Sequence, residues 1–477
     1  MIMRMILMKL SSREQALVDI YKKAQQDLFN TITKKAASGL PASYQRAMLR
    51  EVNFELARLQ KRSVAWVESA LPKEYNYWLD EAVGNLDNWF KYADRRGIPL
   101  YSIGYADMMA LNKGAIEALV DENIARLSVA NASLKSNIRK VITQKIAMGE
   151  TIQQTKKRII EEIYGLNGEG KININGRNYD PAKYAEMVAR TATREASNSA
   201  SLNEAKAVGS DLVKMTSHSP TCEICGPLQG RVYSISGNSK DYPPLSVAFS
   251  SGYNTVHPNC RHSVSAYIVE LKTEEDLKAS KEFSNRPFDD QGQSKETLDR
   301  YYKQQKLQQD LWRDSQQLLR YNVTLGSKKM PTLSIWRSWK RSMATQYVIR
   351  KLDYKRRRDL IKNPEKTLEN ADKVTIESSK FTDYIFSPSN PDGWAKGVAF
   401  TSRLGYNKTT YRKLRNEIKR SAMDYPAVFK GNNGYVDKYE QRVVLYGLKG
   451  KPANVNLAWG VEGDKTRLIT AYIEEEK

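Results

Sequence analysis

The sequence predicts a mainly α protein with a long helical N-terminal region, a small zinc-knuckle α+β central domain and a separate C-terminal α+β domain. Three observations support this fold class. Apolar residues recur at helical spacing through most of the first 160 positions, every cysteine and histidine lies between 218 and 262, and strand-like alternation is confined to the centre and the end. We divide the chain into 1–180 (helical), 181–272 (Cys/His domain), 273–365 (basic helical extension and linker) and 366–477 (C-terminal module).

Two helices are expected at the start of the chain. A capping box at Ser11–Gln15 opens the first helix, and Gly39-Leu40-Pro41 ends it. The second begins near Ser43 and should stop before Pro72, because proline lacks the amide hydrogen that a helix interior needs. The short connection predicts antiparallel packing of the pair.

The helical pattern resumes after Pro99 and continues to about Tyr164. Residues 165–179 are glycine-rich and indicate a loop or a small hairpin. Tyr184 to Val208, rich in alanine, serine and threonine, predicts a closely packed helix that Gly209 ends.

The central cysteines and histidines have the spacing of metal ligands. Cys222 and Cys225 form a C-x-x-C pair, and His257 and Cys260 form an H-x-x-C pair. Zinc prefers four tetrahedral nitrogen and sulfur ligands, so these four residues predict one structural zinc. Two further histidines are alternative ligands: His262 and His218.

Other interpretations of these residues remain open. A redox C-x-x-C pair needs a surrounding βαβ pattern, which the sequence lacks. The thiols could also be ordinary buried small residues and the histidines surface residues. A catalytic zinc would need an open ligand position and a nearby base. Strands are expected beside the pairs at 231–235 and 263–269.

Composition limits the class of protein. The net charge is +22, from 76 Lys and Arg against 54 Asp and Glu. This excess indicates contact with a polyanion such as DNA or RNA, or serves solubility alone. Three cysteines in this pattern suit a reducing cytosol. No apolar run reaches about 18 residues, so no membrane span is expected. The apolar start, Met1 to Lys9, is too short for a signal peptide.

The central block resembles a known family. Cys222 to Gly237, followed by His257 to Ser263, is similar to tailed-phage minor capsid proteins, namely the phage minor capsid protein 2 group and the related Mu-type head-morphogenesis proteins. The resemblance covers roughly residues 10–350. It implies a virion protein present in few copies near the portal vertex, assembled in the host cytoplasm. Its implied role is head assembly or genome delivery, and its implied partners are portal, capsid and scaffold proteins and packaged DNA.

A polar helix and a basic segment follow the central block. Residues 297–320 are polar on most faces, so this helix should dock on a partner or run across a surface. Four consecutive basic residues then stand in a run that ends at Pro364: Lys355, Arg356, Arg357 and Arg358. They are candidate nucleic-acid-binding residues, or the solvated face of a linker.

The last hundred residues indicate a compact α+β module. Helices are expected at 396–404 and 409–422, and strands at 436–446, 453–461 and 466–473. The pattern resembles small domains attached to polymorphic toxins, and the closing strand is similar to that of the barnase/EndoU/colicin/RelE-like RNase group. We expect a non-catalytic module; the alternative is a capsid-carried RNase that acts in the host.

The module contains no histidine, which excludes histidine-based acid–base cleavage. A nuclease would therefore depend on charge stabilisation by Lys396 and Arg467, with Tyr472 positioning the 2′-hydroxyl. Thr470 and Arg403 are the other candidate polar groups. The alternative is that Thr470 and Tyr472 simply point outward from a half-buried strand.

Overall fold

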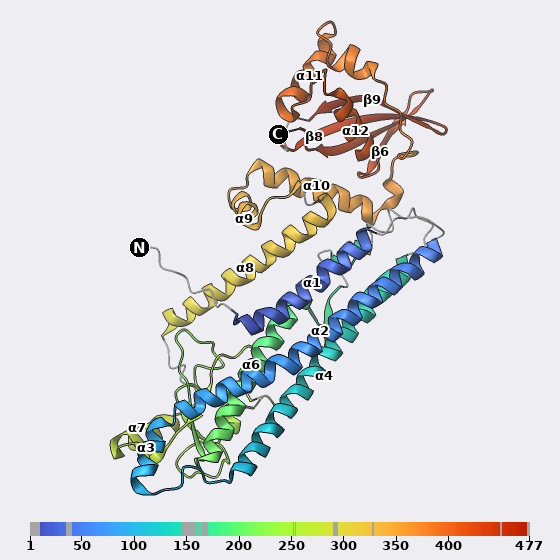
Figure 1. The fold of residues 1–477 in the computed structure, drawn as a ribbon. Helices are drawn as coiled ribbons and strands as arrows, with labels where there is room; N and C mark the ends of the chain where they lie inside the picture. Colours follow the sequence, from blue (N-terminus) through green and yellow to red (C-terminus); the bar gives the residue numbers. More distant parts are fainter. Residues whose placement is uncertain are drawn as a thin grey trace. The chain divides into compact units, whose positions relative to one another are not determined.

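The computed structural model describes residues 10–34, 41–145, 159–160, 162–164, 170–250, 252, 254–289, 294–326, 329–448 and 451–474. The chain forms two compact units, residues 1–142 with 170–307 and residues 143–169 with 308–477. It is mainly helical, with a long helical N-terminal region and a C-terminal sheet domain, as predicted (Figure 1).

Long helices make up most of the first unit (Figure 1). They are α1 (Ser12–Lys34), α2 (Pro41–Gly84), α3 (Asp87–Arg96), α4 (Tyr105–Lys145) and α6 (Pro181–Ala207). The indole Nε1 of Trp66 on α2 donates to the carbonyl oxygen of Arg13 at 2.9 Å. The start of α1 therefore lies beside the second half of α2, which confirms the predicted antiparallel pair. The end of the predicted third helix, between 146 and Tyr164, lies mostly outside the described residues.

The expected stop before Pro72 is wrong, because α2 continues through it to Gly84. Leu71 and Tyr75, on either side of Pro72, are fully buried, and the Tyr75 hydroxyl donates to Oδ1 of Asn112 on α4 at 2.7 Å. A proline inside a helix costs about 3 kcal/mol. Burial of a Leu and a Tyr side chain offsets a cost of that size.

Helix α6 is buried along nearly its whole length in the first unit. The Asp180 carboxylate caps its start by accepting from the amides of Ala182 and Lys183, and Pro181 occupies the first turn. Small side chains let neighbouring helices approach closely. One buried charge, Glu195, is paired with Arg126 of α4 through Nη1–Oε2 at 2.8 Å and Nη2–Oε1 at 3.2 Å.

A small antiparallel sheet follows α6, as predicted beside the Cys/His block. Its strand order is β4 (Val232–Ser234), β3 (Leu212–Met215), β5 (Val264–Ala266), with β3 in the middle. Short helical segments border it: η2 (Leu245–Val247), η3 (Val269–Leu271) and α7 (Glu274–Ser284). The segment 165–179, expected to be a loop or a small hairpin, forms a hairpin of β1 (Ile172–Ile174) and β2 (Arg177–Tyr179). Residues 165–169 of this segment lie outside the described residues.

Helix α8 (Lys295–Leu325) extends the predicted polar helix in both directions. In the second unit its C-terminal part packs with α9 (Leu333–Arg341) and α10 (Thr345–Lys362), followed by η5 (Pro364–Lys366). An aromatic cluster holds the three helices together: Leu318, Tyr321, Leu325, Trp336, Tyr347 and Tyr354. The C-terminal part of this polar helix therefore docks on other helices of the same chain.

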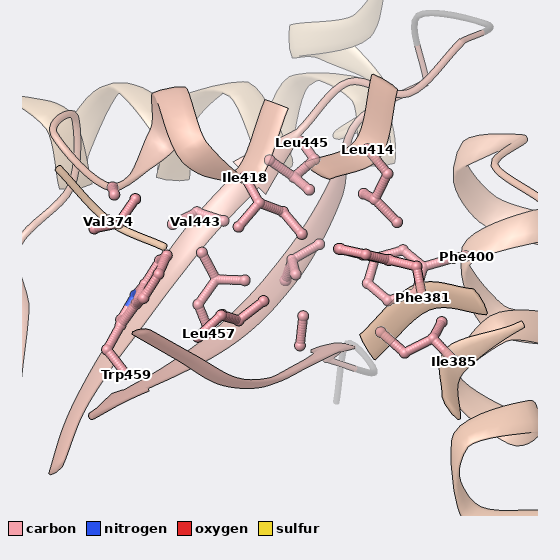
Figure 2. Packing of buried hydrophobic residues seen from close by; sticks show 14 of the residues in the cluster. Val374, Phe381, Ile385, Phe400, Leu414, Ile418, Val443, Leu445, Leu457 and Trp459 are labelled. Atoms are coloured by element: carbon pink, nitrogen blue, oxygen red, sulfur yellow. The ribbon is translucent and has the colours of Figure 1, made fainter. Parts of the chain in front are cut away.

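The C-terminal module is a four-stranded antiparallel sheet with helices on one face (Figure 1). The sheet order follows the chain: β6 (Ala427–Asn432), β7 (Asp437–Leu445), β8 (Ala453–Glu462) and β9 (Lys465–Ile473). Figure 2 shows its core, where Leu414 and Ile418 of α12 (Tyr411–Ser421) and Phe400 of α11 (Pro391–Leu404) face the strand residues Val443 and Leu457.

Two features of the module were missed in the sequence. Strand β6 is an edge strand with little burial, so its residues lack the alternation that marked the other three. The π-helix η6 (Lys380–Ile385) lies against α11 at two glycines. A Cβ at Gly393 would overlap the carbonyl oxygen of Tyr384, and one at Gly397 would overlap that of Ile385. Glycine at both positions therefore permits direct backbone contact.

Candidate metal centre

Two tight turns carry the predicted ligand pairs. The first follows β3, where the amide of Gly226 donates to the carbonyl oxygen of Cys222 at 2.9 Å. The second precedes β5, where the amide of Cys260 donates to the carbonyl oxygen of His257 at 3.0 Å. Strands β3 and β5 are hydrogen-bonded neighbours, so the sheet brings together two turns separated by about thirty residues of sequence.

Side chains of helix α6 hold the second turn in place through hydrogen bonds. The Asn198 side chain donates to the carbonyl oxygen of Asn254 at 2.6 Å and accepts from the amide of Val264 at 3.2 Å. The amide of Asn259 donates to Oγ1 of Thr191 at 3.2 Å. Buried hydrogen bonds of this kind hold the turn in one conformation, which a metal site requires.

The donor atoms form two overlapping groups, within each of which all atoms lie within 4.8 Å of one another. One group is Cys222, Cys225 and His257; the other is Cys225, Cys260 and His262. Cys225 belongs to both, so its sulfur connects the four predicted ligands. His218 is in neither group; its Nε2 lies 3.3 Å from Oγ1 of Thr216.

The distances between donors fit a tetrahedral zinc site. Bond lengths of about 2.3 Å to sulfur and 2.0–2.1 Å to nitrogen give tetrahedral edges of roughly 3.8 Å for S···S and 3.6 Å for S···N. The Cys225 and Cys260 sulfurs are 3.8 Å apart. Nε2 of His257 lies 3.4 Å from the Cys222 sulfur and 3.2 Å from the Cys225 sulfur. The cysteines form no disulfide, and Cys225 and Cys260 are buried.

His257 and His262 each have their second ring nitrogen beside a hydrogen-bond acceptor. Nδ1 of His257 lies 2.7 Å from the carbonyl oxygen of Pro258, and Nε2 of His262 lies 3.1 Å from Oε1 of Gln229. Donation from these nitrogens leaves Nε2 of His257 and Nδ1 of His262 as the atoms that face the sulfurs and that a metal could bind. Metal-binding histidines are usually oriented in this way. Gln229 could not be identified from sequence, because nothing in its spacing marks it.

The electrostatics of the cluster favour thiolates. Hydrogen bonding with the Cys225 sulfur lowers the pKa of Cys222 and of Cys260. The same two interactions raise the pKa of Cys225. A hydrogen bond with Cys222 raises the pKa of His257 to about 9. Two thiolates beside a protonated thiol and imidazole form a set that a divalent cation can bind by displacing the protons.

In the C-terminal module, the structure brings together two of the five candidate catalytic residues, Lys396 and Thr470. Nζ of Lys396 lies 3.2 Å from Oγ1 of Thr470 and 3.1 Å from the hydroxyl of Tyr384, a residue that the sequence reasoning missed. Arg467 and Tyr472 occupy exposed positions on β9, with no described contact to Lys396. Tyr384 lies on the π-helix, which no sequence pattern indicated.

The predicted basic run lies on α10, within the second unit. Lys355 is exposed and Arg358 is half-buried. Nη1 of Arg356 donates to Oδ1 of Asn454 at 3.0 Å. Arg357 is paired with Asp353 and Asp424, both at 2.7 Å. Arg356 and Arg357 therefore make contacts inside the protein, and nucleic-acid binding by this run stays a prediction.

Comparison with known families adds evidence on function. Residues 113–323 match the family model described as Phage minor capsid protein 2. This match supports a structural role in a phage head. The matched residues begin on α4, extend into α8 and include every cysteine and histidine of the chain. They bear out the capsid part of the resemblance, and with it a virion location and capsid-related partners.

The C-terminal module has its own match. Residues 367–475 match a domain of unknown function (DUF6883), whose description carries no link to toxins. No curated protein and no solved structure matches the chain. Within the described residues, no helix combines the length and apolarity needed to cross a membrane.

Proposed function

We propose that this chain is a minor component of a phage or prophage head, bound at the portal vertex, with a structural role in head assembly or genome delivery. The observation that carries the proposal is the family match over residues 113–323. That region contains the buried helix α6 and the Cys/His centre, the two features that organise the first unit. Portal and neighbouring capsid or scaffold proteins are the partners proposed.

One structural zinc, bound by Cys222, Cys225, Cys260 and His257, is part of the proposal. His257 is chosen over His262 because its Nε2 lies within 3.4 Å of two sulfurs, whereas Nδ1 of His262 lies 3.6 Å from one. Four protein ligands would leave no open position, so the ion would fasten two turns together rather than activate water.

The head location is tested on purified particles. Quantitative mass spectrometry should find the chain at a small fraction of the copy number of the major capsid protein. Asymmetric cryo-electron microscopy should place its density at one vertex only. A chain absent from particles, or spread evenly over the capsid lattice, would refute the proposal.

The metal is tested on the purified chain. We expect about one zinc per chain, lost in Cys225→Ser because this sulfur belongs to both donor groups. His257→Ala should lower zinc content far more than His262→Ala. His218→Ala is the matched control, since its ring lies outside both groups. Folded wild-type protein without zinc would contradict the assignment.

The alternative function is a capsid-carried RNase in the C-terminal module. Its support is the cluster of Lys396, Thr470 and Tyr384, in which an ammonium group lies beside two hydroxyls. Such a cluster could bind a phosphate. The same two hydrogen bonds also join α11 to η6, through Tyr384, and to the edge strand β9, through Thr470, which is a purely structural role.

A further inference from the structure

Helix α12 presents two chemically distinct sides. Leu414 and Ile418 are fully buried in the core of the C-terminal module (Figure 2). The opposite side is exposed and basic, with four cations and one amide: Arg412, Lys413, Asn416, Lys419 and Arg420. Their spacing of one, four, seven and eight residues from the first places them on one continuous face.

The charges on this face have no carboxylate partner in residues 329–448 or 451–474, the described parts that surround it. Glu417 is the one acidic residue in the α12 sequence, and it faces inward. It accepts from the hydroxyl of Tyr406 at 2.6 Å and from the amide of Tyr446 at 3.0 Å. The nearby Asp424 is paired with Arg357 of α10. The face therefore keeps its full positive charge.

Other basic helices of the second unit differ in this respect. On α9, Arg337 and Lys340 both bind Asp314, at 2.9 and 2.7 Å. On α10, Arg357 is held by Asp353. The cations of α9 and α10 stabilise the fold. Those of α12 are exposed to solvent and can attract a polyanion.

We propose that the basic face of α12 binds the phosphate backbone of double-stranded DNA. This rests on the proposed function, because a phage head holds packaged DNA. The face extends about 12 Å, from eight residues at 1.5 Å rise. Contacts from lysine and arginine to phosphate oxygens do not depend on base sequence.

Two other polyanions fit the face less well. Single-stranded nucleic acid is usually held by stacking on exposed aromatic rings. The one aromatic residue of α12, Tyr411, instead stacks on Phe381 of η6, with ring centroids 5.9 Å apart. A membrane-surface helix needs a free apolar side to insert, and the apolar side of α12 is buried in the core.

The test measures binding of the full chain to a random-sequence 30-base-pair duplex by fluorescence anisotropy at 50 to 200 mM salt. The variant carries Arg412→Gln, Lys413→Gln, Lys419→Gln and Arg420→Gln. Each lost phosphate contact should reduce the slope of log K against log salt by about 0.9, so four should reduce it by about 3.6. These four contacts then account for about a 10²-fold loss of wild-type affinity between 50 and 200 mM salt.

A matched control removes the same charge from exposed lysines elsewhere: Lys113→Gln, Lys278→Gln, Lys303→Gln and Lys306→Gln. We expect it to keep the wild-type slope. Equal slopes for the α12 variant and the control would overturn the inference, since net charge alone would then explain binding. So would wild-type binding to phosphatidylglycerol vesicles, lost in the α12 variant, with duplex binding unchanged. Particle incorporation is measured separately, so the head proposal can fail while duplex binding remains.

Discussion

Asp353 on α10 is the residue whose loss should most damage the second unit. Its carboxylate is fully buried and accepts three hydrogen bonds. The Tyr425 hydroxyl donates at 2.6 Å, the Tyr446 hydroxyl at 2.8 Å and Nε of Arg357 at 2.7 Å. Arg357 also donates to Asp424 at 2.7 Å. The network joins α10 to the C-terminal sheet domain.

The substitution Asp353→Asn keeps the shape of the side chain and removes its charge. The new amide group has two N–H donors and cannot accept from both tyrosines and from Arg357. Breaking a buried ion pair by removing one partner costs about 3–5 kcal/mol, because the remaining charge stays buried. Asp424 still pairs with Arg357 after the substitution and neutralises part of its charge. We therefore expect the free energy of unfolding to fall by about 3 kcal/mol rather than 5.

Hydrogen exchange of the α10 amides is the assay, because a chain of two units need not unfold in one step. A loss of about 3 kcal/mol should make exchange about 10²-fold faster in α10, with α4 unchanged. Asp359→Asn is the control on the same helix: its pair with Lys366 is exposed, so the effect should stay below about 1 kcal/mol. Equal exchange in the two variants would refute the reasoning.

Three further predictions concern the metal, the packing of α11 and catalysis. Chelation should accelerate exchange in the turns at 222–230 and 257–262, since a structural zinc supplies about 10 kcal/mol of folding energy; unchanged exchange would contradict a structural metal. Gly397→Ala should lower the melting temperature of the C-terminal module, because a Cβ there overlaps the carbonyl oxygen of Ile385. The control Gly114→Ala lies in open space on α4 and should stabilise the first unit by about 0.5–1 kcal/mol. Purified protein should leave RNA intact; cleavage abolished by Lys396→Gln would instead establish the RNase alternative.

Short-range patterns made much of the architecture predictable. The pairs Cys222-x-x-Cys225 and His257-x-x-Cys260 place their donors within single turns, so spacing alone marked them as candidate ligands. Helical periodicity located α1 and α6 for the same reason, since the contacts that shape a helix are local. Strands β7, β8 and β9 alternate in sequence because one face of each packs against the core of the C-terminal module.

Features that depend on distant contacts could not be predicted in this way. Pro72 lies inside a helix because α4 packs on the residues around it. Gln229 orients His262 from a position 33 residues earlier in the sequence. Strand β6, exposed on an edge, has no buried face to impose alternation. In each case the deciding interaction comes from a part of the chain that periodicity does not connect.

The net charge of +22 illustrates the same limit for function. A run of four basic residues at 355–358 is the most conspicuous positive feature of the sequence, yet Arg357 is paired with two carboxylates and Arg356 with Asn454. Which cations are available to a polyanion depends on where the carboxylates lie after folding. Asp353 and Asp424 neutralise charge on α10, and no described carboxylate does so on the exposed face of α12. The contact with DNA that we propose therefore falls on α12, whose sequence holds no run of four consecutive basic residues.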